Sequence, residues 1–426
     1  MYKLKDFSLE AIDAANHEEH KLGGYRFFDF RSHYQPIVEL SSGLIAGYEA
    51  LARREDISGD FVSAGAVFCD RNLPRRDKLL LDRYLRKMAL GEVSSASDTG
   101  FITLNISPDW IDGLSDTSPI PTLEMVRQAG VDPSRVIVEI TEHGGSLENL
   151  KRLTKAYQAA GIKVAIDDFG AGASQIDRVI ELEPDLIKLD MALFKSAVLG
   201  GYAADVVLSI VSMAQRAGCK IICEGVETEE EFYFAIECGA DYIQGWLFDP
   251  ALPAWLSSSS YRKRIDSMKA GYLQQKSRLL ESSARHNQEV AQTLQRMSRR
   301  LSSRDVLSDI VENLPVSQAR RLGVLQFFLC DPQGNQISDN VIVGDDCLRL
   351  NDQYRGYNWS HRPYFPLLNA MNRLQHDHIV VSDAYRDIST GQLCKTHGVF
   401  LSKDRVLLID VLSEDVVLFK SEDAPH

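Results

Sequence analysis

The sequence predicts a TIM-like (β/α)8 barrel with one antiparallel strand, followed by a long linker helix and a smaller α+β domain. Eight short strand-like runs alternate with helical stretches between residues 34 and 248, and the last seven runs carry a polar residue at or near their C-terminal ends. A long polar stretch then separates them from a later group of strand-like runs. At 426 residues the chain is longer than one hydrophobic core usually organises, so we expect two domains.

The eight runs of the barrel are mostly apolar without alternation, as expected for strands that are covered on both faces. Helical spacing appears between them, for example over residues 147–160 and 203–217. Such an alternation over about 215 residues is typical of a (β/α)8 barrel. The runs are Gln35–Leu40, Leu44–Leu51, Phe101–Ile106, Val136–Thr141, Lys163–Asp168, Leu186–Asp190, Lys220–Glu224 and Tyr242–Leu247.

The first two runs break the regular pattern, since only Ser41-Ser42-Gly43 separates them. A parallel crossover needs roughly a dozen residues or more, so these two strands should form an antiparallel hairpin. One strand of the barrel is therefore expected to run in the opposite direction to the others.

The polar residues at the strand ends indicate a site at the mouth of the barrel, where the C-terminal ends of the strands converge and the chemistry of this fold takes place. Carboxylates brought together there repel one another unless cations neutralise them. Carboxylate and amide oxygens are hard ligands that suit Mg or Mn rather than zinc, and their number suits two metal ions. The residues are Glu49, Asn105, Glu139, the pair Asp167 and Asp168, Lys188, Glu224 and Gln244.

Helix capping is the alternative interpretation of each single position, because Asp and Asn are favoured N-cap residues. A surface ion pair is a second alternative. Capping does not call for Glu or Lys at a strand end, so the set as a whole favours a functional site.

The motifs around these residues resemble those of EAL-domain c-di-GMP phosphodiesterases. The run Tyr48-Glu49-Ala50-Leu51-Ala52-Arg53 contains the signature tripeptide, and Gln35-Pro36-Ile37 is similar to the first strand of that family. The tripeptide alone is uninformative, but the ordered series from about Tyr34 to Pro250 is specific. The further motifs are Leu104-Asn105-Ile106-Ser107, Val138-Glu139-Ile140-Thr141-Glu142, Asp167-Asp168-Phe169-Gly170, Ile187-Lys188-Leu189-Asp190, Glu224-Gly225-Val226-Glu227 and Gln244-Gly245-Trp246.

This resemblance implies that c-di-GMP is hydrolysed to linear pGpG with two divalent cations, Mg or Mn. It implies a catalytic group of Lys188, Glu224 and Gln244, in which Lys188 orients the attacking water and Gln244 completes the shell of the metals and water. Substrate contacts would come from Gln35, Leu51 and Arg53, with Arg53 suited to a bidentate phosphate contact. One metal would be held by Glu49, Asn105, Glu139 and Asp167, and the other by Asp167, Asp168 and Glu224.

The loop after Asp168 departs from the family pattern. The family often continues with Thr-Gly-Tyr-Ser-Ser, whereas this chain has Ala171-Gly172-Ala173-Ser174-Gln175. By resemblance the loop borders a dimer interface and is anchored by Glu142. We therefore expect a homodimer and an altered control of activity.

We expect the whole chain to divide into an N-terminal extension (1–33), the barrel (34–255), the linker helix (256–301) and a C-terminal domain (302–426). The helix from about Tyr261 to Arg300 has apolar heptad positions at both ends and a polar centre. A weak coiled coil and a solvated connector helix are both compatible with that pattern.

The C-terminal domain resembles PAS or Cache-type sensors, and the order of the two domains is similar to YkuI-type EAL proteins. The supporting runs are Ser360-His361-Arg362-Pro363-Tyr364-Phe365 and Ser382-Asp383-Ala384-Tyr385-Arg386-Asp387, followed by Thr390-Gly391. Arg362, Tyr364 and Asp383 are candidates for binding an unknown small carboxylate or amine; internal ion pairs are the alternative. Strands are predicted over Leu325–Cys330, Gln336–Val343, His378–Ser382, Gly398–Leu401 and Arg405–Asp410.

Composition and charge exclude several function classes. The chain is 44% apolar and 25% charged, as in ordinary globular domains, and its net charge of −13 argues against binding of duplex nucleic acid. No stretch approaches the ~20 apolar residues of a membrane helix, and the N-terminus has no signal-peptide core, so we expect a cytoplasmic protein without a membrane span. The seven cysteines are scattered and odd in number, which predicts buried free thiols.

Two other functions compete with hydrolysis of c-di-GMP. A catalytically weak or inactive receptor would bind c-di-GMP and signal through the linker and the C-terminal domain. A barrel that acts on another phosphodiester or on a sugar phosphate is the third possibility. The complete set of five acidic residues favours catalysis, because a receptor does not need five metal-binding acids.

Overall fold

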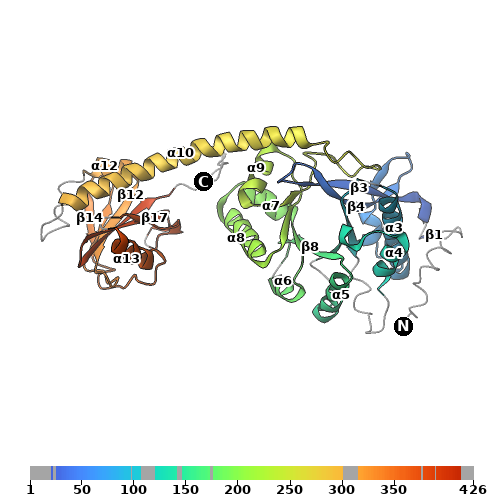
Figure 1. Ribbon diagram of the computed structural model, residues 1–426, viewed down its shortest axis with the longest axis horizontal. Helices are drawn as coiled ribbons and strands as arrows, with labels where there is room; N and C mark the ends of the chain where they lie inside the picture. Colours follow the sequence, from blue (N-terminus) through green and yellow to red (C-terminus); the bar gives the residue numbers. More distant parts are fainter. Residues whose placement is uncertain are drawn as a thin grey trace. The chain divides into compact units, whose positions relative to one another are not determined.

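The computed structural model describes residues 21–22, 25–96, 98–106, 120–141, 146–172, 176–300, 315–375, 378–388 and 390–413. It divides into two compact units, whose described parts meet in sequence between Leu273 and Gln274. Figure 1 shows the elements of both units.

Eight strands of the first unit close into a barrel that helices surround (Figure 1). β3 is antiparallel to both of its neighbours, β4 and β11, whereas every other adjacent pair in the ring is parallel. The predicted barrel with one reversed strand is therefore confirmed. The ring runs through β3 (Phe30–Glu39), β4 (Ile45–Glu55), β6 (Phe101–Ile106), β7 (Val136–Thr141), β8 (Lys163–Phe169), β9 (Leu186–Leu189), β10 (Lys220–Cys223) and β11 (Tyr242–Ile243).

Three barrel strands, β3, β4 and β11, differ most from their predicted bounds. The β3–β4 hairpin is longer than expected, because pairing continues from Val38 opposite Ile45 as far as Phe30 opposite Arg54. The short strand β5 (Phe61–Ser63) pairs with the far end of β4. β11 is shorter than expected: beyond it the amides of Gln244 and Leu247 donate to the carbonyls of Cys223 and Val226, so the chain turns across the end of β10.

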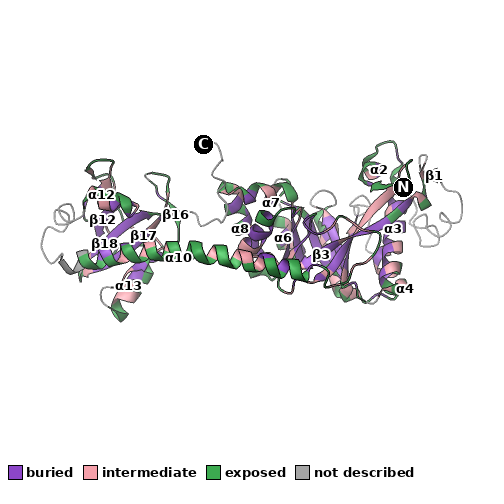
Figure 2. Ribbon diagram, turned by 90° about the horizontal axis from the view of Figure 1, so that it is seen from above, coloured by how far each residue is buried: buried purple, intermediate pink, exposed green. Residues whose placement is uncertain are grey.

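Helices cover the outside of the barrel, and the barrel strands contribute many of the buried residues of the first unit (Figure 2). The predicted helices over 147–160 and 203–217 are observed as α5 and α8 with bounds shifted by one or two residues. The described helices are α2 (Gly65–Cys69), α3 (Arg75–Ser95), α4 (Pro121–Ala129), α5 (Leu147–Ala159), α6 (Ile176–Leu182), α7 (Met191–Val198), α8 (Gly201–Ala217) and α9 (Glu229–Cys238).

The barrel interior contains a small apolar cluster that is separate from the large core between the strands and the helices. Its members come from five strands of the ring and are at most 3% exposed. Phe101 and Tyr242 pack against the cluster with their rings edge to face. The cluster is formed by Ile37, Ile137, Ala165, Leu186 and Ile222.

The second unit is an α+β domain built on an antiparallel sheet with the order β14-β13-β12-β18-β17-β15, and β16 also pairs with β17. Strands β14 and β16 were not predicted, because they are short and polar. The elements are α12 (Val316–Arg321), β12 (Val324–Cys330), β13 (Asn340–Val343), β14 (Leu348–Asn351), α13 (Tyr364–Leu374), β15 (Val380–Val381), β16 (Tyr385–Arg386), β17 (Leu393–Ser402) and β18 (Arg405–Leu412).

This sheet has a separate core on each face. Along β12, Phe327 packs with α12 and the end of α10, whereas the next residue, Phe328, packs with Tyr364 and Phe365 of α13. Because side chains alternate along a strand, neighbouring residues face opposite sides of the sheet. The PAS or Cache-like character of the domain remains a prediction.

The long helix α10 (Arg262–Arg300) has the predicted extent. Near its start, Ile265 is fully buried in the core of the first unit, and towards its end Val290 and Leu294 are buried in the core of the second. Between these ends, Leu280 is exposed, and the middle of the helix is largely green in Figure 2. The apolar residues at both ends of α10 are therefore buried by cores of the same chain. A coiled-coil partner helix is not needed to explain them.

All seven cysteines are free, as expected. Five of them are buried, but Cys69 and Cys347 are exposed, so the prediction of buried thiols is wrong for these two.

Gly47 is a position at which the barrel interior has no room for a side chain. A Cβ on Gly47 would overlap the ring and the carbonyl of Phe101. We expect Gly47→Ala to lower the free energy of unfolding by about 1–3 kcal/mol through overpacking. Urea unfolding followed by circular dichroism measures the change.

Gly91→Ala is the matched control, because Gly91 lies within α3 with open space around it. There the same substitution should raise the free energy of unfolding by about 0.5–1 kcal/mol through helix propensity. A Gly47→Ala protein that is as stable as Gly91→Ala would contradict the packing described for the barrel interior.

Candidate active site

The barrel strands place ionisable residues one layer above the apolar cluster in the barrel interior. Residues two apart in a strand share a face, so a residue that follows an inward-facing apolar residue by two positions also faces inward. The layer lies at the C-terminal ends of the parallel strands, which form the mouth of the barrel. The pairs are Ile137 with Glu139, Ala165 with Asp167, Leu186 with Lys188, and Ile222 with Glu224.

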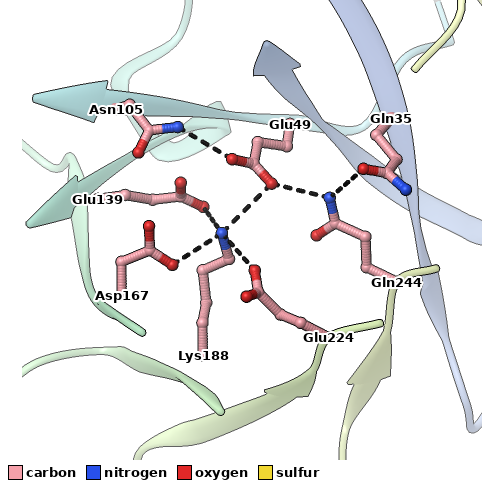
Figure 3. Close-up of polar contacts among 8 residues, drawn as sticks. All are labelled: Gln35, Glu49, Asn105, Glu139, Asp167, Lys188, Glu224 and Gln244. Atoms are coloured by element: carbon pink, nitrogen blue, oxygen red, sulfur yellow. Dashed lines mark hydrogen bonds and ion pairs between the residues drawn. The ribbon is translucent and has the colours of Figure 1, made fainter. Parts of the chain in front are cut away.

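Lys188 lies at the centre of this polar layer (Figure 3). Its Nζ is 2.7 Å from Glu224 Oε1, 3.0 Å from Glu139 Oε1, 3.0 Å from Asp167 Oδ1 and 3.3 Å from Glu49 Oε2. One ammonium thus faces four carboxylates that come from β4, β7, β8 and the end of β10. A single positive charge does not neutralise four negative ones, so the layer favours additional cations.

Three amide side chains extend the network around Glu49 (Figure 3). Asn105 Nδ2 donates to Glu49 Oε1 over 2.9 Å, and Gln244 Nε2 donates to Glu49 Oε2 over 2.8 Å. Gln244 Nε2 also lies 3.2 Å from Gln35 Oε1. The strand register brings these residues together, because Gln35 is paired with Glu49 and Asn105 with Glu139.

The protonation equilibria reflect this crowding. Burial raises the pKa of Glu139 well above its ordinary value, and Glu49 adds to the effect. Burial also raises the pKa of Glu224 to about 8 in spite of the nearby Lys188 charge. For Glu49, burial is outweighed by the Lys188 charge and the hydrogen bonds from Gln244 and Asn105, so its pKa is lowered.

Lys188 itself stays protonated. Burial disfavours its charged form, but the carboxylates of Asp167, Glu139, Glu224 and Glu49 outweigh that cost and raise its pKa well above the ordinary value. The ammonium is therefore a fixed positive charge in the barrel mouth and not a general base.

Asp168 reaches the site through an unusual backbone conformation. Its φ is +54°, in the left-handed region that non-glycine residues rarely adopt, and the pairing of β8 with β9 is irregular between Ile166 and Phe169. Ligand atoms of Asp167, Asp168 and Glu224 lie within 4.8 Å of one another. Neighbouring strand residues normally face opposite sides, so the irregularity explains how both aspartates contribute to one cluster.

The donor set fits divalent cations. Both carboxylate oxygens of Glu139, which is fully buried, lack a hydrogen-bond donor among the described residues, and Oε2 also has no ion pair. A buried carboxylate oxygen without a partner is costly, and a cation would satisfy it. The ligand atoms are all oxygens, which suits Mg, Mn or Ca rather than zinc.

A cleft of about 520 Å³ adjoins this layer and includes Leu51, Arg53 and Asn105 in its lining. The Arg53 guanidinium donates to the carbonyl of Ala52 and has no carboxylate partner among the described residues. Gln35 is not in the lining, and contacts Gln244 instead. Of the three predicted substrate residues, Leu51 and Arg53 line the cleft, and only Arg53 has a side chain that can donate hydrogen bonds to a ligand there.

The part of this cleft that follows the signature strand was not predicted from the sequence. Ser63, Gly65 and Phe68 line it, and they belong to β5 and α2. The mixed run from Phe61 to Cys69 has no periodic signal, and only its position after the signature strand points to the site.

The capping alternative fails for the helices whose caps are described. Side-chain caps of α5, α7 and α9 come from Ser146, Asp190 and Thr228. None of these belongs to the set of strand-end residues that converge here. Glu142, the expected anchor of the loop, and residues 173–175 lie outside the described residues.

Two of the three candidate residues in the C-terminal domain line a common pocket, namely Arg362 and Tyr364. Asp383 is exposed and is not part of that lining. Asp387 and Asp410, which the sequence analysis did not propose as ligand contacts, supply the acidic groups instead.

The fold and the strand-end motifs agree with comparisons to known proteins. Residues 27–251 match the family model of the EAL domain, and the chain belongs to this family. Residues 256–423 match a second model, described as the EAL-domain associated signalling protein domain. No helix within the described part of the chain combines the length and hydrophobicity that a membrane crossing requires.

Relatives match either the whole chain or the barrel. The Bacillus subtilis EAL-domain containing protein YkuI is 27% identical over 391 residues, which cover 90% of this chain and 94% of YkuI. The Pseudomonas aeruginosa cyclic di-GMP phosphodiesterase RocR is 31% identical over 236 residues, which cover 53% of this chain and 58% of RocR. The crystal structure of YkuI with substrate c-di-GMP and calcium superimposes with a TM-score of 0.80 at 25% identity, covering 90% of this chain and 95% of YkuI.

Divalent cations should stabilise the folded chain, because they bind carboxylates that converge only in the folded state. We expect Mn or Mg at about 100 times its Kd to raise the melting temperature by roughly 5 °C. Asp167→Asn should remove most of this rise, since Asp167 contacts Lys188 and belongs to the cluster with Asp168 and Glu224. Differential scanning fluorimetry with and without chelator measures it.

Asp177→Asn is the matched control, because Asp177 is an exposed carboxylate on the neighbouring helix α6. With Mn or Mg, the melting temperature of Asp177→Asn should rise as much as that of the wild type. An equal rise in both variants, or none in the wild type, would remove the support for a metal site at the barrel mouth.

Proposed function

We propose that this chain hydrolyses c-di-GMP to linear pGpG with two divalent cations, Mg or Mn, at the mouth of the barrel. The observation that carries the proposal is the convergence of four carboxylates around Lys188. Membership of the EAL family supports it, and so does the likeness to YkuI with its bound c-di-GMP and calcium. The names of relatives such as RocR indicate the same reaction.

The proposed metal ligands fall into two sets that share Asp167. Glu49, Asn105, Glu139 and Asp167 would hold one cation, and Asp167, Asp168 and Glu224 the other. The mutual approach of the last three supports the second set. The Oε2 of the buried Glu139, which has no partner among the described residues, supports the first. When bound there, two such cations would supply an activated water and would neutralise the charge of the displaced oxygen.

The other residues would bind and orient the substrate. Lys188 is a permanent ammonium and would stabilise the negative charge that develops at phosphorus. Arg53 would bind a phosphate oxygen pair through its free donors. Gln244 and Gln35 would hold Glu49 in place through their hydrogen bonds, and Leu51 would contact the ligand from the cleft.

A receptor that binds c-di-GMP without hydrolysing it is the second candidate function. It would need the cleft and Arg53, but it would not need a buried lysine among four acids. That costly arrangement favours catalysis, since buried like charges are retained where they perform chemistry.

We also propose a homodimer and regulation by the C-terminal domain. The segment after the Asp168 loop exposes large apolar side chains: Ile176 and Ile180 on α6, and Leu199, Tyr202 and Val206 around the start of α8 are between 48% and 77% exposed. Exposed apolar side chains of this size are typical of interaction surfaces. A dimer contact there would lie close in sequence to Asp168, which explains how association would affect the site.

Incubation of c-di-GMP with the purified full chain and Mn or Mg should yield pGpG, which chromatography separates from the substrate. Chelator should abolish the product, because the acidic layer alone cannot activate water. Glu49→Ala should lower turnover at least about a hundredfold, since it removes one acid and the partner of two amides.

Glu55→Ala serves as the matched control, because Glu55 is an exposed glutamate on the same strand. It should retain wild-type turnover. Binding of c-di-GMP without product in the wild type would favour the receptor, and undiminished turnover in chelator or in a folded Glu49→Ala protein would contradict the proposed mechanism.

Removal of the C-terminal domain should alter the rate and leave the chemistry in place. The truncated chain should end at Leu273, because Tyr261, Ile265 and Met268 belong to the core of the first unit. We expect it to bind and hydrolyse c-di-GMP with a rate changed by about fivefold or more relative to the full chain. Identical kinetics of a folded truncated chain would contradict regulation by this domain.

A further inference from the structure

Gln244 lies just beyond the end of the last barrel strand. Because β11 ends at Ile243, the position of Gln244 depends on contacts outside the barrel ladder. Its amide donates to the carbonyl of Cys223 over 2.9 Å, and its carbonyl accepts from the amide of Val226 over 3.0 Å. The amide of Leu247 then donates to the Val226 carbonyl over 2.9 Å. This short segment is therefore held against the loop that follows β10.

The beginning of α10 contacts the same segment from the other side. The Arg264 guanidinium donates to the carbonyl of Leu247. Tyr261, one residue before the helix, donates its hydroxyl to Asp249 Oδ2 over 2.5 Å. Two side chains at the start of α10 thus fix the chain three and five residues after Gln244.

The first turns of α10 are also attached to the β3–β4 hairpin. Ile265 is fully buried, and its side chain packs so closely on Gly43 that a Cβ there would lie 3.3 Å away. Lys269 Nζ donates to the carbonyl of Ser41 over 3.1 Å. The start of α10 therefore connects the turn of the hairpin to the segment that follows Gln244.

The same two parts of the chain meet again inside the barrel (Figure 3). Gln35 and Glu49 belong to the hairpin, and Gln244 Nε2 lies 3.2 Å and 2.8 Å from their side-chain oxygens. The contact of Gln244 with Glu49 thus depends on a second connection outside the barrel, which α10 provides. A misplacement of about 1 Å in an active site can cost roughly a hundredfold in rate, so this outer connection matters for the chemistry.

We propose that Arg264 is a positioning residue of the active site, which holds the segment after Gln244 so that its amide remains hydrogen-bonded to Glu49. Arg264 lies beyond residues 27–251, which match the EAL family model, so the strand-end motifs do not include it. The site is thereby completed by the helix that leads to the C-terminal unit. This proposal rests on the function proposed above and names one contact through which α10 affects the site.

Arg264→Met tests the proposal in the full chain, because methionine keeps an unbranched side chain and removes the hydrogen-bond donors. With Mn, kcat for c-di-GMP should fall about tenfold while KM changes less than about twofold, since Glu49 is displaced and the Arg53 contact is kept. The affinity for Mn alone, measured by calorimetry, should fall about threefold or more. Arg264→Lys should restore most of both, because an ammonium also donates to the Leu247 carbonyl.

A double-mutant cycle separates positioning from a merely structural role. In Gln244→Ala protein the amide that Arg264 positions is absent, so adding Arg264→Met should change kcat and the Mn affinity by less than about twofold. A contact that only stabilises the helix start would give the same factor in both backgrounds, and that result would overturn the proposal. Wild-type kcat and Mn affinity in a folded Arg264→Met protein would overturn it as well.

Arg262→Met is the matched control, because Arg262 is an exposed arginine of the same helical turn. Within the described part of the chain its side chain makes no hydrogen bond or ion pair. It should retain wild-type turnover and Mn affinity. If Arg264→Met fails to fold, Tyr261→Phe takes its place in the same cycle, since it removes only the hydroxyl that binds Asp249.

The Mn affinities distinguish this proposal from the proposed hydrolysis. A wild-type chain that binds Mn and forms no pGpG would contradict hydrolysis alone, because the affinities of the Arg264 variants still decide the positioning role. A wild-type chain that binds no Mn would contradict both.

Discussion

The barrel of this protein depends on one electrostatic constraint, which is the burial of four carboxylates around a single ammonium. Such a group is unstable unless the surrounding structure holds it rigidly and supplies hydrogen bonds. The closed ring of eight strands provides the rigidity, and the apolar cluster below fixes the depth of the polar layer. Amides from β6 and from the end of β11 donate to Glu49, and Gln35 of β3 accepts a hydrogen bond from Gln244. The stability of the fold and the chemistry of the site are therefore set by the same side chains.

Local backbone conformation also positions two residues of the site, Asp168 and Gln244. Asp168 occupies the left-handed region, and such backbone strain is typical of functional sites. Two residues later, Gly170 has a φ of +107° and lies against Leu193, where a Cβ would overlap that side chain. Gly245, which follows Gln244, lies so close to the Val226 backbone that any side chain would overlap it. These glycines are therefore required for the close approach of chain segments that place Asp168 and Gln244.

Both units contain buried acidic residues, but the surrounding side chains differ. In both, residues on one face of the strands form an apolar cluster, and buried acidic residues lie on that same face. In the barrel the acids are numerous and all ligand atoms are oxygens, which suits metal ions. In the C-terminal unit Asp387 and Asp410 line a small pocket together with Arg362 and aromatic rings. Buried acidic residues on a closely packed sheet are thus a feature of both units.

The sequence by itself determined the barrel, its reversed strand and the strand-end residues, because strand periodicity and connection length are local properties of the chain. Bounds of β6 and β7 match the prediction, as does the convergence of Glu49, Asn105 and Glu139. Only the tertiary structure decided the central position of Lys188, the contribution of β5 and α2 to the cleft, and the acids of the C-terminal pocket. Asp387 and Asp410 were missed in favour of Asp383 because burial and partner choice depend on contacts between distant segments, such as Gln326 with Asp410. Periodicity along the chain specifies which face a residue occupies, but not which charges share a cavity.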